Sequence, residues 1–271
     1  MPSLLKIVWF IPRPEGDVDE LEALYQGQHV RRGMRQENLR AFRISRALYP
    51  QPGVIRDLTG SAEPGSFRFS EGYWDSFADI EECYRSPNGL AALADGALNA
   101  SPRVPRGPQP VFFAAEQEFD TDSRLQFDIF RGAYTDPAPV KLFVFVRLRE
   151  GEEGAFDAGY AGLASALGES RGLGPHVLSR RLDHQLQLGR ASQWPPRGVD
   201  SYDRIAEYYF PDAKSAGQFL ESPAFSRVVS LAGQHGPMTL PVLTEPQEVF
   251  FTTTGQQPLS KGWAEFYRSL P

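Results

Sequence analysis

The sequence contains a single cysteine, Cys83, among its 271 residues. One cysteine can form neither an internal disulfide nor a thiolate metal cluster, because both need at least two sulfur atoms. Low cysteine usage is typical of a reducing compartment, so we expect a cytoplasmic protein. The first ten residues agree with that expectation, since they lack the basic start and the longer apolar stretch of a secretory signal.

Long apolar runs and an excess of basic charge are also missing. No run approaches the roughly 20 apolar residues that a membrane-spanning helix needs. The 28 basic and 34 acidic residues give a net charge of -6, so the chain generates no field that would attract nucleic acid or an anionic membrane surface. We therefore expect no nucleic-acid partner and no membrane partner.

The usual motifs for metals and nucleotide cofactors are absent. No two of the four histidines have the four-residue helical spacing or the alternate-residue strand spacing that converges on one ion. Gly151, Gly154 and Gly159 do not form a dinucleotide fingerprint after a strand of a parallel βαβ unit. His176 could supply the axial ligand of a heme, but nothing else in the sequence calls for one. The expectation is no metal and no cofactor.

What the chain does contain is an internal repeat. Five segments recur in the same order at an offset that stays between 134 and 138 residues. The pairs are Lys6–Gly16 with Lys141–Gly151, Ile44–Leu48 with Leu178–Leu182, Glu71–Trp74 with Glu207–Phe210, Ser86–Pro87 with Ser222–Pro223, and Val111–Phe113 with Val249–Phe251. Five matches in register indicate two copies of one structural unit. Residues present in both copies are expected to serve the scaffold, and residues present in one copy are candidates for function.

Each copy has the order strand, helix, strand, strand, helix, strand. The hydrophobic patterns predict strands at 4–11, 40–48, 67–74 and 110–115 in the first copy, and at 140–148, 175–182 and 204–210 in the second. A helix is expected after Asp17 and another from Phe77 through Pro87, with a loop rich in Pro and Gly at 50–66. This is the order of a ferredoxin-like βαββαβ unit, an antiparallel sheet with two helices on one face.

The strands at 4–11 and 140–148 are apolar on both faces, so the sheet face without helices must also be covered. We therefore expect an α+β fold in which two tandem ferredoxin-like units pack sheet to sheet as an intramolecular barrel, with the helices outside. The expected boundaries are 1–119 for the first unit, 120–139 for a packed linker, 140–254 for the second unit and 255–271 for a C-terminal tail helix. Such a chain would be a monomeric pseudo-dimer or would assemble into a homodimer.

Three features resemble the EthD domain family, which belongs to the dimeric α+β barrel superfamily. They are Tyr25 four residues before His29, the aromatic pair Tyr73 and Trp74, and a helix that ends in Ala-Leu-Ala-Asp95. The sequence departs from the family at Arg31, where a proline is common. The resemblance covers nearly the whole chain as a tandem pair. EthD-like proteins include accessory proteins of ether degradation and decarboxylases or dehydratases of aromatic polyketide biosynthesis, so the resemblance implies one of these functions. The wider superfamily also includes isomerases and cofactor-independent monooxygenases.

His29 and Asp95 are the candidate catalytic residues. His29 continues the apolar stripe of the first expected helix, and its counterpart in the second copy is Ala164. Near the helix C-terminus the dipole favours the imidazolium and burial favours the neutral ring, so His29 could act as a general acid/base near neutrality. Asp95 corresponds to about Leu231 and could orient His29 or bind a substrate hydroxyl. The alternatives are a hydrogen-bonded core histidine and a solvated helix-end carboxylate.

Aromatic residues of the first unit are expected to line an apolar pocket between sheet and helices, suited to a flat hydrophobic ligand. The substrate-binding candidates are Tyr25, Phe42, Tyr73 and Trp74, together with His176, which matches Phe42 in the second unit. An arginine and a glutamate each recur at the same position in both copies and are expected to be structural. Within one unit, the arginine and the glutamate are expected to face each other across neighbouring strands as an ion pair. The recurring residues are Arg46 with Arg180 and Glu71 with Glu207.

These features favour a cofactor-free lyase of the dehydratase, decarboxylase or isomerase type, acting by acid/base catalysis on a small aromatic or polyketide-like metabolite. One alternative is a non-catalytic accessory protein that binds a hydrophobic metabolite for a partner oxygenase. A cofactor-independent monooxygenase is the other alternative.

Overall fold

The structure of the chain, a computed structural model, describes residues 5–12, 23, 25, 30, 33, 35–61, 66–93, 111–119, 140–174, 176–182, 202–245 and 248–251. The strands are β1 (Leu5–Pro12), β2 (Ala41–Arg46), β3 (Ser66–Trp74), β4 (Val111–Phe119), β5 (Val140–Arg147), β6 (His176–Arg181), β7 (Arg204–Phe210), β8 (Met238–Leu243) and β9 (Glu248–Phe251). The helices are α3 (Gly53–Thr59), α4 (Phe77–Arg85), α5 (Pro87–Leu93), α7 (Glu153–Gly168), α8 (Ala213–Leu220) and α9 (Pro223–His235).

Two antiparallel groups of four strands have the same topology. The strand order is β4-β1-β3-β2 in the first unit and β8-β5-β7-β6 in the second. In both groups the first and third strands of the unit lie in the centre, as in a ferredoxin-like fold. Within the described residues, the strands predicted from the repeat at 4–11, 40–48, 67–74, 140–148, 175–182 and 204–210 are confirmed to within two residues.

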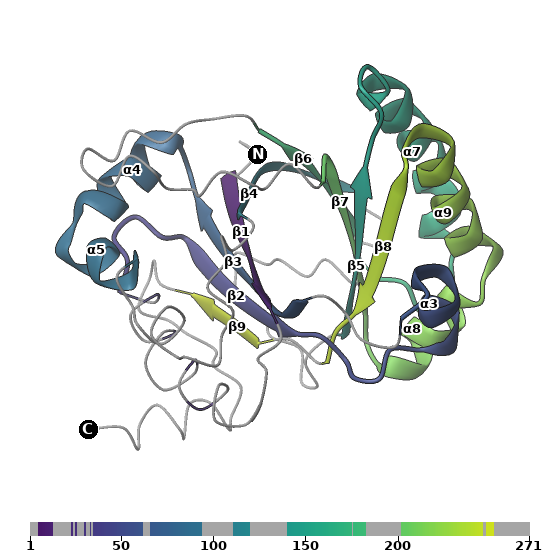
Figure 1. The fold of residues 1–271 in the computed structure, drawn as a ribbon, viewed down its shortest axis with the longest axis horizontal. Helices are drawn as coiled ribbons and strands as arrows, with labels where there is room; N and C mark the ends of the chain where they lie inside the picture. The colour runs from purple at the N-terminus through teal and green to yellow at the C-terminus, as the bar shows by residue number, and fades with distance from the viewer. Residues whose placement is uncertain are drawn as a thin grey trace.

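The two groups join into one barrel. β4 pairs with β1 through residues 111–115 and with β6 through residues 114–119. On the other side of the barrel, Thr244 forms a bridge with Ala47, and β9 pairs with β2. The helices lie outside the strands, with α4 and α5 on one side and α7, α8 and α9 on the other (Figure 1). The fold is therefore α+β, two tandem ferredoxin-like units that form an intramolecular dimeric α+β barrel.

The strand register corrects one pair of the repeat. Ala114 lies opposite Lys6, and the Thr244 N–H donates to the carbonyl of Lys141, the counterpart of Lys6, at 2.8 Å. β4 is therefore equivalent to β8 followed by β9, and its first residues correspond to β8. The match of Val111–Phe113 with Val249–Phe251 was wrong, because the second segment lies on β9 and pairs with β2 of the other unit.

Helix α3 lies inside the segment 50–66, which was predicted to be a loop. Its Ile55 is buried in the hydrophobic core of the second unit, against which Val54 and Leu48 also pack. Gln51 fixes the approach to the helix, since its Nε2 donates to the Leu243 carbonyl at 2.9 Å and its Oε1 accepts from the Leu243 N–H at 2.8 Å. The first unit thus adds a helix to the helical side of the second, where α3 packs against β8 (Figure 1).

The repeated Ser-Pro dipeptides begin the corresponding helices α5 and α9 of the two units. The Ser222 hydroxyl accepts from the Phe225 N–H at 3.3 Å, and the Ser86 hydroxyl accepts from the Gly89 N–H at 3.1 Å. Serine at the N-cap satisfies a backbone donor that has no partner within the helix, and proline at the first helical position has no N–H to satisfy. These echoes therefore serve the scaffold, as expected.

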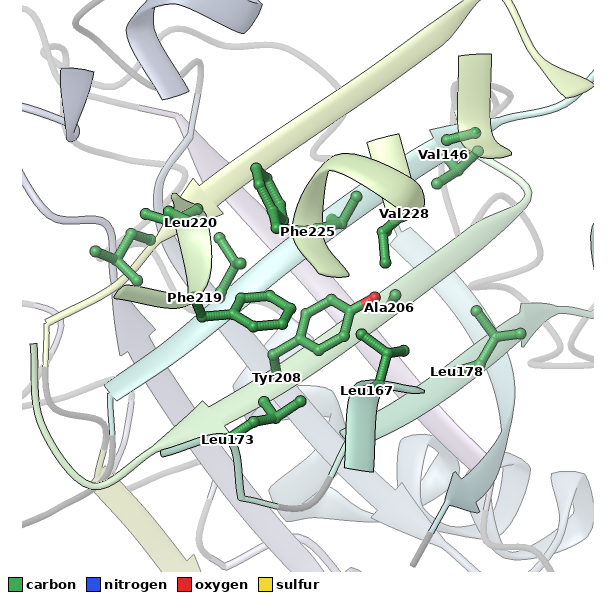
Figure 2. Packing of buried hydrophobic residues seen from close by; sticks show 14 of the residues in the cluster. Val146, Leu167, Leu173, Leu178, Ala206, Tyr208, Phe219, Leu220, Phe225 and Val228 are labelled. Carbon is green, nitrogen blue, oxygen red and sulfur yellow. The ribbon is translucent and has the colours of Figure 1, made fainter. Parts of the chain in front are cut away.

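Hydrophobic side chains fill both faces of the second unit's sheet. On the outer face, the strands pack against α7, α8 and α9 in one cluster, with the Tyr208 ring beside Phe219 in its middle (Figure 2). On the inner face, Phe143 and Phe145 stack at a ring distance of 5.4 Å in a cluster shared with first-unit residues. Burial on both faces is the reason that β5 reads as a continuous apolar run.

Several predicted segments lie outside the described residues. They are most of the helix after Asp17, the linker 120–139 and the tail 255–271. Among the helices that the structure describes, none has the length and apolar character needed to cross a bilayer.

Candidate functional site

Four charged side chains meet inside the barrel, two from each unit. Lys6, Glu71, Lys141 and Glu207 all have 0% exposed side chains, and we call them the ionic core. The Lys6 Nζ lies 2.7 Å from Glu207 Oε1 and 3.5 Å from Glu71 Oε1. The Lys141 Nζ lies 2.6 Å from Glu71 Oε2 and 3.1 Å from Glu207 Oε1. Each lysine therefore contacts the glutamate of its own unit and that of the other unit.

Arg43 adds an asymmetric charge beside the ionic core. It lies opposite Glu71 in the strand register, where the second unit has Val177 opposite Glu207. Its guanidinium is buried, donates to the Tyr209 hydroxyl and lies 4.9 Å from the ring centroid of Tyr73. Arg43 is thus a charged residue of the interior that only one copy carries.

The charges of the ionic core shift one another's pKa values. Burial by itself raises the pKa of Glu71, but the positive charges of Lys141, Lys6 and Arg43 outweigh it and hold this pKa far below its ordinary value. Burial lowers the pKa of Lys141, an effect opposed by Glu207 and Glu71 and reinforced by Arg43 and Lys6. The carboxylate of Glu71 therefore stays charged in the interior because cations surround it.

The predicted pairing of Arg46 with Glu71 was wrong. Arg46 Nε instead donates to Glu245 at 2.7 Å, and Arg180 is exposed. Side chains alternate across a strand, so Arg43 and not Arg46 shares the inner face with Glu71. Sequence reasoning also missed Lys6 and Lys141. The available signal was a lysine at the same position in both copies of an otherwise apolar strand.

The outer, helix-facing side of the first unit carries a group of aromatic rings. The Trp9 ring lies 6.5 Å from that of Phe42 and 6.3 Å from that of Trp74, and Trp74 packs 6.2 Å from Tyr84 of α4. The two indoles cover Gly72, where a Cβ atom would lie 2.5 Å from Trp74 and 3.2 Å from Trp9. We call Trp9, Phe42 and Trp74 the aromatic wall.

Two hydroxyl groups lie on the same face. The Tyr25 hydroxyl is hydrogen-bonded to the Ser70 hydroxyl, and both residues are buried. The guanidinium carbon of Arg68 lies 4.8 Å from the centroid of the Tyr25 ring. The first unit therefore presents polar groups and broad aromatic surfaces together between its sheet and helices.

The equivalent face of the second unit is packed shut. Tyr208 lies opposite Leu142 as Gly72 lies opposite Ile7, so a tyrosine replaces the glycine. The Tyr160 hydroxyl donates to the Tyr208 hydroxyl at 2.9 Å, and the rings of Phe219 and His176 lie 5.2 Å and 6.0 Å from the Tyr208 ring. Figure 2 shows the Tyr208 ring enclosed by aliphatic and aromatic side chains.

The structure places the candidate substrate-binding residues in three regions. Tyr25, Phe42 and Trp74 share the helix-facing side of the first unit, whereas Tyr73 lies on the barrel side of the same strand. His176 lies in the core of the second unit, where burial lowers its pKa to about 4. The neutral ring of His176 is therefore the form present near neutrality. The candidate catalytic residues His29 and Asp95 lie outside the described residues.

Neither a metal centre nor a reactive thiol stands out in the part of the chain that the structure describes. Within it, no group of three or more His, Cys, Asp and Glu residues is arranged to hold a metal ion. Burial, together with the charge of Glu37, raises the pKa of Cys83 to about 12. The Cys83 thiol is therefore protonated and unreactive at neutral pH.

Solved structures share this fold over nearly the full chain. An anthrone oxidase-like protein is 9% identical, with a TM-score of 0.61 over 96% of this chain and 97% of its own. A proposed monooxygenase from Fusobacterium nucleatum subsp. nucleatum is 7% identical, with a TM-score of 0.56 over 95% of this chain and 98% of its own. At such identities the likeness establishes the fold and not the reaction.

An EthD family protein is also among the similar solved structures. An EthD family protein from Bacillus halodurans is 18% identical over 34% of this chain and 83% of its own, with a TM-score of 0.29. The sequence matches no protein-family model and no curated protein. The solved structures of the anthrone oxidase-like protein and the proposed monooxygenase therefore establish the dimeric α+β barrel fold, and the EthD family stays a resemblance of sequence motifs.

Proposed function

We propose that the first unit binds a flat aromatic metabolite between its sheet and its helices and converts it by acid/base catalysis without a cofactor. His29 is the proposed general acid/base, with Asp95 as the residue that orients it. The second unit, in this proposal, is a structural copy that completes the barrel.

The observation that carries the proposal is the difference between Gly72 and Tyr208. In the second unit, a tyrosine at this position fills the space between sheet and helix and accepts a hydrogen bond from Tyr160. Glycine leaves that space to the indoles of Trp9 and Trp74. Flat aromatic surfaces of this kind favour planar ligands, because stacked and edge-to-face ring contacts add to the burial of apolar area.

The proposed chemistry begins with proton removal. A neutral histidine takes a proton from a carbon beside a carbonyl group, or from a phenol, of the bound molecule. In a dehydration, the carbanion then expels a hydroxyl group, and the imidazolium returns the proton so that water leaves. In an isomerisation, the proton is returned to another carbon. One residue poised near neutrality can perform both roles, which supports the lyase and isomerase types.

Oxygenation is the second candidate, and the fold neighbours favour it. One neighbour is described as anthrone oxidase-like and another as a proposed monooxygenase. Deprotonation of an anthrone gives an electron-rich anion that can react with dioxygen. One oxygen atom becomes the new ring carbonyl, and the other leaves as water with the two hydrogens of the oxidised carbon.

Two probes separate these reactions. The purified protein is incubated with 3-hydroxy-1-tetralone, whose dehydration gives fluorescent 1-naphthol, and with 1,8-dihydroxyanthrone, whose oxidation consumes oxygen and gives a quinone. Acceleration of either conversion over the protein-free rate, and its loss in His29→Ala, would support the corresponding reaction. Loss of rate by about a hundredfold or more is expected from removal of a general base.

An accessory binding protein would give a different pattern. The probes would bind with similar affinity to the wild type and to His29→Ala, and neither protein would change them. Ala164→His is the matched control, because it places a histidine at the corresponding position of the second unit and should not create activity. Turnover unchanged by His29→Ala would overturn the assigned base.

A further inference from the structure

We propose that the Tyr208 side chain is a built-in occupant of the second unit, held between sheet and helices as a bound phenol would be. The second unit is then closed to ligands by its own chain, and removal of the Tyr208 ring opens a site there. This inference rests on the proposed function, because it compares Tyr208 with a ligand of the first unit.

The Tyr208 ring lies beside the counterparts of two candidate binding residues of the first unit. His176 is opposite Tyr208 in the strand register, as Phe42 is opposite Gly72. The His176 and Tyr208 rings are stacked, with centroids 6.0 Å apart and planes at 17°. Tyr160, at the repeat offset from Tyr25, contacts the other end of the same side chain.

The Tyr208 hydroxyl accepts a hydrogen bond that is specific to the second unit. Tyr160 donates it at 2.9 Å, and both side chains are fully buried. In the first unit Tyr25 is bonded to Ser70, and the second unit has Ala206 at that position of the register. Burial raises the pKa of Tyr208 although the bond from Tyr160 opposes this shift, so its hydroxyl stays protonated. A phenolic ligand would accept the same bond.

Apolar side chains enclose the remainder of the Tyr208 ring. The Phe219 ring lies 5.2 Å away, and Leu167 and Leu173 belong to the same buried cluster (Figure 2). Phe219 corresponds to Cys83, so the second unit is more apolar at this point than the first. A ring in an apolar shell with one polar contact has the surroundings of a small ligand in a binding site.

Removal of the ring distinguishes an occupant from an ordinary core residue. Tyr208→Ala deletes the atoms of one phenol molecule and leaves the Tyr160 hydroxyl at the end of the space. An apolar cavity of about 150 Å³ can stay dry and bind benzene. The space left by Tyr208 should therefore bind phenol, and bind it better than benzene because Tyr160 can donate to it.

The test is a calorimetric titration with phenol and with benzene. Tyr208→Ala should bind one more phenol per chain than the wild type. Addition of Tyr160→Phe to this variant should lower the ratio of phenol affinity to benzene affinity about three- to tenfold, because phenol then loses its hydrogen bond. An unchanged ratio, or no additional phenol in Tyr208→Ala, would overturn the inference.

Tyr209→Ala is the matched control, because it truncates the neighbouring buried tyrosine on the barrel side of the same strand. The Tyr209 hydroxyl accepts from Arg43 and lies 3.4 Å from Glu207 Oε2. A space beside these charges should take up water and gain no phenol site. An equal gain of phenol in both variants would show that any tyrosine-sized space binds it, and would refute the special role of Tyr208.

Circular dichroism covers the case in which Tyr208→Ala does not fold in buffer. Millimolar phenol should then refold the variant, and benzene should do so less effectively, because a ligand that binds only the folded state stabilises it. Absence of refolding by phenol would count against the inference.

The stoichiometry also separates this inference from the proposed function. No phenol on the wild type and one on Tyr208→Ala would contradict the site of the first unit and leave Tyr208 as an occupant. Two phenols on the wild type would show that the second unit is open, which would overturn the inference and leave the proposed function standing.

Discussion

The Lys6 Nζ lies 2.7 Å from Glu207 Oε1, although the two residues are 201 positions apart and belong to different units. Both side chains are fully buried inside the barrel. Since Lys141 and Glu71 form the reciprocal contact at 2.6 Å, the ionic core connects the two halves of the chain in both directions. The register of one unit against the other is therefore fixed by charge as well as by strand pairing.

Removal of one member of the ionic core should be costly. Lys6→Met keeps the side-chain volume but leaves buried carboxylates with one cation fewer, so we expect a loss of about 3–5 kcal/mol in the free energy of unfolding. Urea denaturation measures it. Arg40→Met is the control, because the Arg40–Asp75 pair is half exposed and should contribute under about 1 kcal/mol. Equal effects of the two substitutions would contradict the assignment of the ionic core as a stabilising contact.

His176 should make stability depend on pH. Its pKa is lowered by burial from 6.5 to about 4, so the unfolded chain binds the proton more readily than the folded one. This contribution to stability is fully present above pH 6.5 and is lost as the pH falls toward 4, by about 2 kcal/mol at pH 5. His176→Phe, which installs the residue found at position 42, should remove this part of the slope. Urea midpoints at pH 7 and pH 5 measure it, and parallel slopes in both proteins would refute the expectation.

Gly72 should not tolerate even a methyl group. A Cβ atom there would lie 2.5 Å from the Trp74 ring, so the indole must move, and overpacking of this kind costs about 1–3 kcal/mol. Thermal unfolding and tryptophan emission of Gly72→Ala report the loss and the movement. Gly162→Ala on α7 is the control, because a methyl group added there would meet nothing within 4 Å, and it should be neutral or slightly stabilising.

Gln51 should stabilise the contact between the two units. Its amide makes two hydrogen bonds with the Leu243 backbone, where β2 approaches β8, and the side chain is buried. Gln51→Ala should lower the unfolding free energy by about 1–3 kcal/mol, because it leaves buried backbone groups without those partners. Gln234→Ala on the exposed side of α9 should change it by under about 0.5 kcal/mol. Hydrogen exchange of the Leu243 amide should rise in the first variant only.

The first three strands of each unit could be predicted, because the two copies of each of these strands confirmed one another. Helix α3 could not, since seven residues with one buried side chain, Ile55, carry too little periodicity, and its partner surface belongs to the other unit. β8 was missed because Pro241 interrupts its apolar pattern. The similar sequence of Val249–Phe251 then suggested a match with Val111–Phe113, which the strand pairing does not support.

The aromatic face could be predicted in part. Tyr25 and Trp74 were named from a family resemblance and Phe42 from the hydrophobic pattern of its strand. These three residues do share one side of the sheet, whereas Tyr73 falls on the other by strand alternation. The importance of Gly72 and Ser70 could not be predicted, because it becomes clear only when they are compared with Tyr208 and Ala206 at the same positions of the second unit. The ionic core could not be predicted without the barrel, because its four residues come together only when the two sheets face each other.

Helix α3 makes the second half of the chain depend on the first. Ile55, which the first half provides, completes the apolar core of the second half. A fragment that began at residue 140 would lack this side chain and would expose that part of its apolar interior to water. The two halves are therefore not interchangeable, although they share one strand topology.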